Sequence, residues 1–414
     1  MKTYVFIIRR ICDISGALQY VYNKMNYLES HGWRVLIFSS MHGNILIEGL
    51  KKYERLIIPS LYMSPSCYRK KEVKRTITRI INEIGSCNPD DCIIESDITQ
   101  RAVWGELIAS QLQCRHLCML VQEKYNKKAE PDSLLQFKYD RHELACISKT
   151  TVQQLFGEDE DTVRSDARFI AYCNNVIQGT TDNYSTLINP NADFTFGSLG
   201  RLDKPCVPFI VEAFCRYAQK HPNKTFNVIM IGGSLVKGKE GQVRKVFSKC
   251  SNVHLVLTGN VYPIPLSFAQ KFDVFVSTAG AAMATYYSGI PTVKVNPITG
   301  DSVGVIGLDY MRSERNMYKS MDNTTIEDSI NNALNNKERI IFEGARNDEY
   351  EERMRVEFQR QLTFVDYTNL MEYYPEEKLM RIKTPSHFPQ YFLWMIGHFF
   401  SPKGRSVIWK MIRN

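Results

Sequence analysis

Short apolar runs alternate in the first half of the chain with longer stretches whose apolar residues recur at helical spacing, every three to four positions. The helical pattern is found at Gly16–Ser30, Lys71–Ile84 and Thr99–Gln111. The apolar runs predict strands at Tyr4–Ile8, Arg34–Ser39, Arg55–Pro59, Asp91–Glu95, Arg115–Gln122, Ala145–Ser148 and Arg168–Tyr172. Strands that alternate with helices favour right-handed βαβ units and a parallel sheet covered on both faces.

The same rhythm restarts after Asn174–Asn191, which is rich in turn-forming residues and is interpreted as a linker. Strands are predicted at Phe194–Ser198, Phe226–Ile231, His254–Leu257, Val274–Ser277 and Thr292–Val295, and helices at Val207–Lys220 and Thr325–Leu334. A chain of 414 residues is also longer than one α/β core usually accommodates. We therefore expect two doubly wound domains, residues 1–190 and 191–346, which face each other across a cleft with ligand sites at their strand ends.

Residues 347–414 depart from this rhythm. Arg353–Leu362 fits a helix, and the segment after Arg381 combines aromatic residues with Lys and Arg and contains no Asp or Glu. Two interpretations of this C-terminal helical segment stay open. It crosses back to pack on the first domain, or its aromatic and basic tail lies on a membrane surface.

Composition narrows the class of protein. Apolar residues at 44% and charged residues at 23% are ordinary for a globular protein, and a net charge of +8 without a nucleic-acid-binding motif argues against a nucleic acid partner. No apolar run reaches the roughly 18 residues of a transmembrane helix. The eleven cysteines form no CxxC pair and several lie in apolar runs, which predicts free thiols and a cytoplasmic protein.

The strongest candidate for chemistry is the sequence DFTFGSLGRLDK at Asp193–Lys204, in which a strand is followed by Gly200, Arg201 and Lys204. In an α/β sheet, ligands bind beyond the carboxyl ends of the strands. Glycine lets the backbone approach a ligand there, and Arg presents forked donors to phosphate oxygens. The alternative interpretation is an ordinary strand–helix turn with solvated charges.

Four blocks of the second domain resemble, in order and spacing, the donor-site motifs of GT-B glycosyltransferases close to family 4, the type that builds bacterial capsule and lipopolysaccharide. The blocks are Phe196–Phe214, Val228–Ser234, Asn252–Asn260 and Phe272–Val293. The resemblance implies the GT-B fold of two Rossmann-like domains, and transfer of a sugar from a nucleoside diphosphate donor with retention of configuration. It also implies that no metal or other cofactor is needed, and a UDP-sugar is the expected donor.

The resemblance further implies a donor site. Arg201 and Lys204 would neutralise the diphosphate, and the backbone would approach it at Gly200, Gly232, Gly233, Thr278, Ala279 and Gly280. The family's pair of glutamates is absent from the last block, where Ala284, Thr285 and Tyr286 occupy the region of the second.

Candidate residues of the first domain follow its predicted strands. Asp13 is a candidate catalytic base or, alternatively, a helix cap, and Glu123 is a second catalytic candidate. Arg10, Gly16 and His42 are expected to contact the acceptor.

The sequence thus predicts a cytoplasmic glycosyltransferase with a polysaccharide or lipid-linked glycan acceptor and peripheral contact with the inner membrane leaflet. Two alternatives remain. The first is a non-catalytic GT-B-like module that binds a nucleotide sugar or a partner enzyme. The second is a sugar-nucleotide epimerase, which would require acid and base groups on both cleft walls.

Overall fold

The computed structural model describes residues 2–12, 14–97, 99–121, 133–146, 155–156, 177–234, 236–310, 320–342, 347–366 and 372–382. The chain divides into two compact units. The first holds the described residues up to 156 together with those from 351 to 382, and the second holds those from 177 to 350. Asp13, Glu123, the predicted strand Arg168–Tyr172 and the tail beyond 382 lie outside the described residues.

The first unit is built on a parallel sheet with the strand order β2-β1-β3-β4-β5. Its strands are β1 (Thr3–Arg10), β2 (Arg34–Met41), β3 (Cys92–Ser96), β4 (Arg115–Leu120) and β5 (Leu144–Cys146). β1 pairs in parallel with both β2 and β3. The carboxyl ends of these strands therefore share one edge of the sheet, where a Rossmann-like unit binds its ligands.

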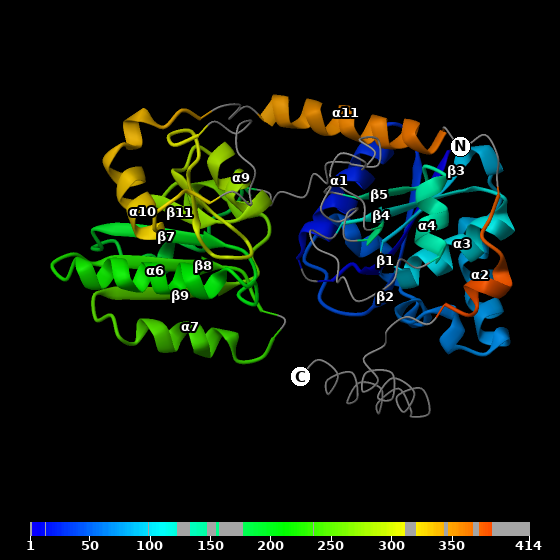
Figure 1. Ribbon diagram of the computed structural model, residues 1–414, viewed down its shortest axis with the longest axis horizontal. Coiled ribbons are helices and arrows are strands. Elements are labelled where there is room, and N and C mark those ends of the chain that lie inside the picture. Colours follow the sequence, from blue (N-terminus) through cyan, green and yellow to red (C-terminus); the bar gives the residue numbers. More distant parts are fainter. Residues whose placement is uncertain are drawn as a thin grey trace. The chain divides into compact units, whose positions relative to one another are not determined.

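Helices cover both faces of this sheet (Figure 1). They are α1 (Gly16–Ser30), α2 (Lys70–Ile84), α3 (Thr99–Leu112), α4 (Ser133–Asp140), α11 (Asn347–Asp366) and α12 (Glu376–Leu379), with 3-10 turns at Glu48–Leu56, Pro59–Tyr62, Pro65–Cys67 and Pro89–Asp91. Neighbouring residues of β3 point to opposite faces. Glu95 contacts Lys24 of α1, whereas Ser96 contacts His116, which in turn bonds to Glu106 of α3.

The predicted strand Arg55–Pro59 is wrong. Residues 48–56 form a 3-10 helix that buries Leu50, Tyr53 and Leu56 at a spacing of three, and Pro59 starts another 3-10 turn. Only Ile57 makes an isolated bridge, to Ser39 of β2. Because the first 3-10 helix ends at Leu56 and Pro59 starts the next turn, Ile57 is the one residue of this segment that pairs with β2.

Helix α11 packs against α1 within the first unit. The Tyr20 hydroxyl donates to Gln361 Oε1 at 2.9 Å, and the Tyr27 hydroxyl donates to Gln359 Oε1 at 3.0 Å. The ring of Phe358 is fully buried and lies 5.5 Å from that of Tyr27, centroid to centroid. The helix expected around Arg353–Leu362 is therefore present, and it packs against α1 of the first unit.

The second unit contains a six-stranded sheet in the order β13-β12-β11-β7-β8-β9 and a two-stranded sheet of β10 and β6. The strands are β6 (Ile177–Gln178), β7 (Phe194–Leu199), β8 (Phe226–Ile231), β9 (Val253–Gly259), β10 (Ile264–Pro265), β11 (Val274–Ser277), β12 (Thr292–Val295) and β13 (Ser302–Val305). The five predicted strands are confirmed. β13 was not predicted, and it pairs antiparallel with β12 as the edge of an otherwise parallel sheet.

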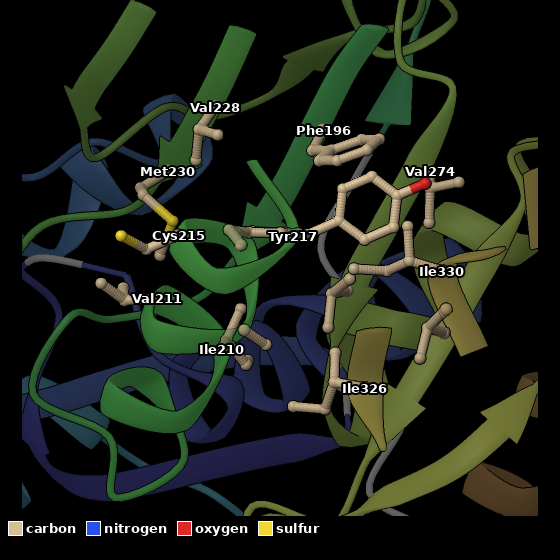
Figure 2. Close-up of a cluster of buried hydrophobic side chains, with 14 of the residues drawn as sticks. Phe196, Ile210, Val211, Cys215, Tyr217, Val228, Met230, Val274, Ile326 and Ile330 are labelled. Atoms are coloured by element: carbon tan, nitrogen blue, oxygen red, sulfur yellow. The ribbon is translucent and has the colours of Figure 1, made fainter. Parts of the chain in front are cut away.

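The helices of the second unit are α6 (Val207–Lys220), α7 (Lys239–Phe247), α8 (Leu266–Ala269), α9 (Ala279–Tyr287) and α10 (Ile326–Asn335), with 3-10 turns at Ser185–Leu187 and Lys337–Arg339. Figure 2 shows the core of this unit, in which side chains of α6 and α10 meet those of the strands. Phe196 of β7 lies between Phe214 and Tyr217 of α6 and Phe226 of β8. This packing fixes β7, and with it the turn that follows.

One expectation about the cysteines is corrected. Cys215 of α6 and Cys250 are joined by a disulfide, although the cysteine pattern predicted free thiols in a reduced compartment. Cys92 and Cys118, which were expected to be free, are free and buried. Sequence spacing alone does not reveal the pair because the two residues are 35 positions apart and meet only after α6 and the strands have packed.

Candidate functional site

The turns that follow β7 and β8 touch backbone to backbone. The Gly200 N–H donates to Ile231 O at 2.9 Å, and the Leu202 N–H donates to Gly233 O at 2.9 Å. Gly232 has a φ of 141°, and a Cβ there would lie 2.2 Å from Gly200 O. Any side chain at 232 would therefore push the two turns apart.

Two cations lie beside this contact. Arg201 and Lys204 are both partly exposed, and a Cβ on Gly200 would be 3.7 Å from Lys204 Nζ, so the lysine side chain crosses over the glycine. Arg201 Nη2 lies 3.5 Å from Asp203 Oδ2, which offsets part of its charge. Guanidinium and ammonium groups next to bare backbone are suited to binding phosphate oxygens.

The start of helix α9 lies at the same edge. β11 is paired with β7, and the Ser277 hydroxyl at the end of β11 donates to Leu199 O at 2.7 Å. Thr278 is the N-cap of α9, but its side chain makes no capping hydrogen bond, and Ala279 has a positive φ of 47°. The first N–H groups of the helix, including that of Gly280, therefore add positive potential beside the β7 turn.

The expected donor-site residues are thus brought to one sheet edge by β7, β8 and β11. The structure refines one of them, since the Gly233 N–H already donates to Asn260 Oδ1 at 2.8 Å. That N–H shapes the turn and is not available to a ligand.

Sequence reasoning missed a further cation, Lys294. It stands on β12 in register with Ser277 of β11, so both side chains lie on the same face of the sheet as α9. The residue is only 8% exposed, and burial lowers the pKa of its ammonium from 10.5 to about 8. A charged residue at a core position of the TVKV run is the signal that could have identified it.

The candidate acceptor residues lie at the corresponding edge of the first unit. Arg10 ends β1 and lines a cavity, Gly16 begins α1 and is exposed, and His42 follows β2 and is exposed. Because β1 and β2 are paired, the three residues come from neighbouring elements at the carboxyl edge of the sheet.

A buried cluster in the first unit has the hydrogen-bond order of a hydrolase triad. Ser96 Oγ lies 2.8 Å from His116 Nε2, and His116 Nδ1 lies 2.7 Å from Glu106 Oε2. Burial lowers the pKa of His116, and the charge of Lys138 lowers it further. Burial alone would raise the pKa of Glu106, but Lys138 and His116 bring it to about 2.

This cluster cannot serve as a nucleophilic site, because Ser96 is 0% exposed and no substrate carbonyl can reach its hydroxyl. Lys138 also bonds to Glu143, so the cluster is a buried ion network that holds α3 and α4 on the sheet.

Within the described ranges, no group of three or more His, Cys, Asp or Glu side chains is placed to hold a metal ion. Among the helices that the structure describes, none has the length and apolarity to span a membrane.

The fold was compared with those of solved structures. Anabaena HepE in complex with UDP-glucose matches with a TM-score of 0.57 at 10% identity, covering 88% of this chain and 100% of that one. A glycosyltransferase from Rickettsia africae matches with a TM-score of 0.51 at 15% identity, covering 92% of this chain and 96% of that one. Sucrose-phosphate synthase from Thermosynechococcus elongatus matches with a TM-score of 0.51 at 11% identity, covering 88% of this chain and 97% of that one.

These likenesses establish the fold as the GT-B architecture of two Rossmann-like units that the sequence analysis expected. No family model matches the chain. No curated protein matches it in sequence either.

Proposed function

We propose that the protein is a glycosyltransferase of the GT-B type, close to family 4, which moves a sugar from a nucleoside diphosphate donor to a polysaccharide or lipid-linked glycan acceptor. The donor is a UDP-sugar. The reaction needs no metal and retains the configuration of the sugar. The second unit, with limits at residues 191 and 346, binds the donor, and residues 1–190 select the acceptor.

The observation that carries this proposal is the edge of the second sheet where Gly200 and Gly232 touch beside Arg201, Lys204 and the start of α9. A diphosphate leaving group gains negative charge as the sugar–phosphate bond breaks. Preorganised cations and helix N–H groups stabilise that charge without a metal ion. The chemistry therefore requires the same groups that β7, β8 and β11 bring together.

The remaining roles are assigned from the places of the residues in the sequence. Asp13 or Glu123 acts as the catalytic carboxylate, and Arg10, Gly16 and His42 contact the acceptor. The aromatic and basic tail contacts the inner leaflet of the membrane, where lipid-linked acceptors are found.

A donor screen tests the proposal. The purified full chain is incubated with UDP-, GDP-, dTDP- and CMP-sugars, without and with a divalent cation, while nucleotide release and thermal stability are measured. A UDP-sugar that stabilises the protein and is slowly hydrolysed without metal is the expected result. Stabilisation without release, even when candidate acceptors are added, would favour the non-catalytic binding module. A response to no donor at all would contradict the proposal.

A further inference from the structure

A cavity of about 170 Å³ opens at the carboxyl edge of the first sheet, and its lining includes no residue of the proposed donor site. It is lined by the ends of β1, β3 and β4 and by the first turns of α1. A single water needs about 10–15 Å³, so the cavity has room for a larger polar group. The ends of parallel strands are where α/β sheets bind their ligands.

Arg101, at the start of α3, lines this cavity and is only 2% exposed. Its Nε donates to Asp97 Oδ1 at 2.6 Å, but Nη2 is buried and has no hydrogen-bond partner among the described residues. A buried guanidinium N–H without an acceptor is costly, so such groups are retained where a ligand supplies the acceptor. An acceptor with more than one oxygen would match the fork of the guanidinium.

The beginning of α1 supplies a second set of donors. Ser15 is its N-cap and accepts the Leu18 N–H at 3.2 Å, and both Ser15 and Ala17 line the cavity. The first turn of this 15-residue helix contains no acidic residue. Its remaining N–H groups and the helix dipole favour negative charge at this point.

The two carboxylates that line the cavity already have partners. Glu95 Oε2 accepts from Lys24 Nζ at 2.6 Å and from the Tyr4 hydroxyl at 2.6 Å. Asp97 accepts from Arg101 and from the Arg9 N–H. With Glu95 paired to Lys24 and Asp97 paired to Arg101, neither carboxylate adds an uncompensated negative charge to the lining.

We propose that this cavity binds an oxyanion, held by the Arg101 guanidinium and the N–H groups at the start of α1 and positioned by the Asp97–Arg101 ion pair. The role given to this oxyanion rests on the proposed function, in which the first unit binds the acceptor. If residues 1–190 select the acceptor, then the acceptor carries a phosphate or a carboxylate group, and the oxyanion is that group. The phosphate of a lipid-linked acceptor and the carboxylate of an acidic sugar share this chemistry.

The test uses the full chain labelled with ¹⁵N-alanine and titrated with inorganic phosphate or with acetate at constant ionic strength. Ala17 reports on the cavity, and Ala279 reports on the start of α9, so one spectrum separates the two edges. The two signals are assigned from the variants Ala17→Gly and Ala279→Gly. A saturable shift of the Ala17 signal with either anion is the expected result, and the anion that binds more tightly identifies the source.

Arg101→Gln should weaken the response of Ala17 at least 10-fold, whereas Arg75→Gln, which removes an exposed arginine from α2 of the same unit, should leave it unchanged. If Arg101→Gln does not fold, Arg101→Lys keeps the charge beside Asp97 but removes the fork, and it should weaken the response several-fold. An Ala17 signal that ignores both anions, or that responds equally in the Arg101 variants, would overturn the inference. If the protein turns over a sugar nucleotide but the Ala17 signal does not shift with anions, the proposed function stands and this inference fails. If the Ala17 signal shifts but no donor is bound or hydrolysed, this inference stands and the proposed function fails.

Discussion

Replacing Lys294 by Met should stabilise the second unit and weaken donor binding at the same time. The lysine is 8% exposed, and burial lowers its pKa from 10.5 to about 8. At about 1.4 kcal/mol per pKa unit, keeping this ammonium charged inside the fold costs about 3 kcal/mol. Met keeps the apolar stem without the charge, so the free energy of unfolding at pH 7 should rise by an amount of that order.

The pH dependence of this gain in stability shows whether removal of the buried charge is its cause. Below pH 8 the lysine is charged in both the folded and the unfolded chain, so the folded state carries the full penalty. Between pH 8 and 10.5 the unfolded chain holds the proton and the folded chain does not, so wild-type stability rises with pH. The advantage of Lys294→Met should therefore be largest at pH 7 and disappear near pH 10.5.

The assay is thermal unfolding of the full chain across this pH range. A gain of about 3 kcal/mol corresponds to a rise of roughly 6–12 °C in the melting temperature of a unit of this size. Donor affinity, measured in parallel, should fall because a cation leaves the edge that carries Ser277 and α9. Lys249→Met, an exposed lysine in the same unit, should change neither quantity. A Lys294→Met variant with no gain at pH 7, or with a gain independent of pH, would refute the reasoning.

Further predictions concern the turn, the buried histidine and the tail. Gly232→Ala should abolish donor binding and lower the free energy of unfolding by about 1–3 kcal/mol, because its Cβ would collide with Gly200 O. The control Gly241→Ala lies on helix α7, where a Cβ meets no atom within 4 Å, so it should leave the melting temperature unchanged or raise it. The first unit should lose stability as pH falls below 6.5, because the unfolded chain protonates His116 there and the folded chain does not. The loss should reach up to about 1.4 kcal/mol per pH unit. A denaturation midpoint that is constant between pH 7 and 5 would argue against this account of His116. Deleting Phe388–Asn414 should reduce co-sedimentation with anionic liposomes and leave the chain soluble, and a truncated chain that unfolds would point to a packing role for the tail.

Much of the fold could be predicted from apolar periodicity, because the buried strands of a parallel sheet are continuous apolar runs. Phe226–Ile231 and Val274–Ser277 are strands with the predicted limits. Arg55–Pro59 failed because Leu56 ends one 3-10 helix and Pro59 starts the next, which leaves only Ile57 to form a bridge. Ser302–Val305 was missed because a short edge strand with a glycine carries little periodic signal.

The candidate site was only partly accessible to sequence reasoning. The turn at Gly200 and Arg201 was identified because glycine and arginine after a strand form a local pattern. Lys294 and Arg101 were missed because their significance arises from burial and from the strands beside them, and neither follows from adjacent residues. A single sequence also gave no means to pair Cys215 with Cys250, since that contact depends on tertiary packing.

Calorimetric titration of the Arg201→Ala variant with the donor identified in the screen tests the central claim most directly. If the β7 turn holds the diphosphate, the loss of one charged hydrogen-bonding group should cost about 1.5–3 kcal/mol, which is a roughly 10- to 100-fold loss of affinity. The control Arg244→Ala, which removes an exposed arginine from α7, should bind the donor as the wild type does. Equal affinity in the wild type and in Arg201→Ala would contradict the placement of the donor at this edge.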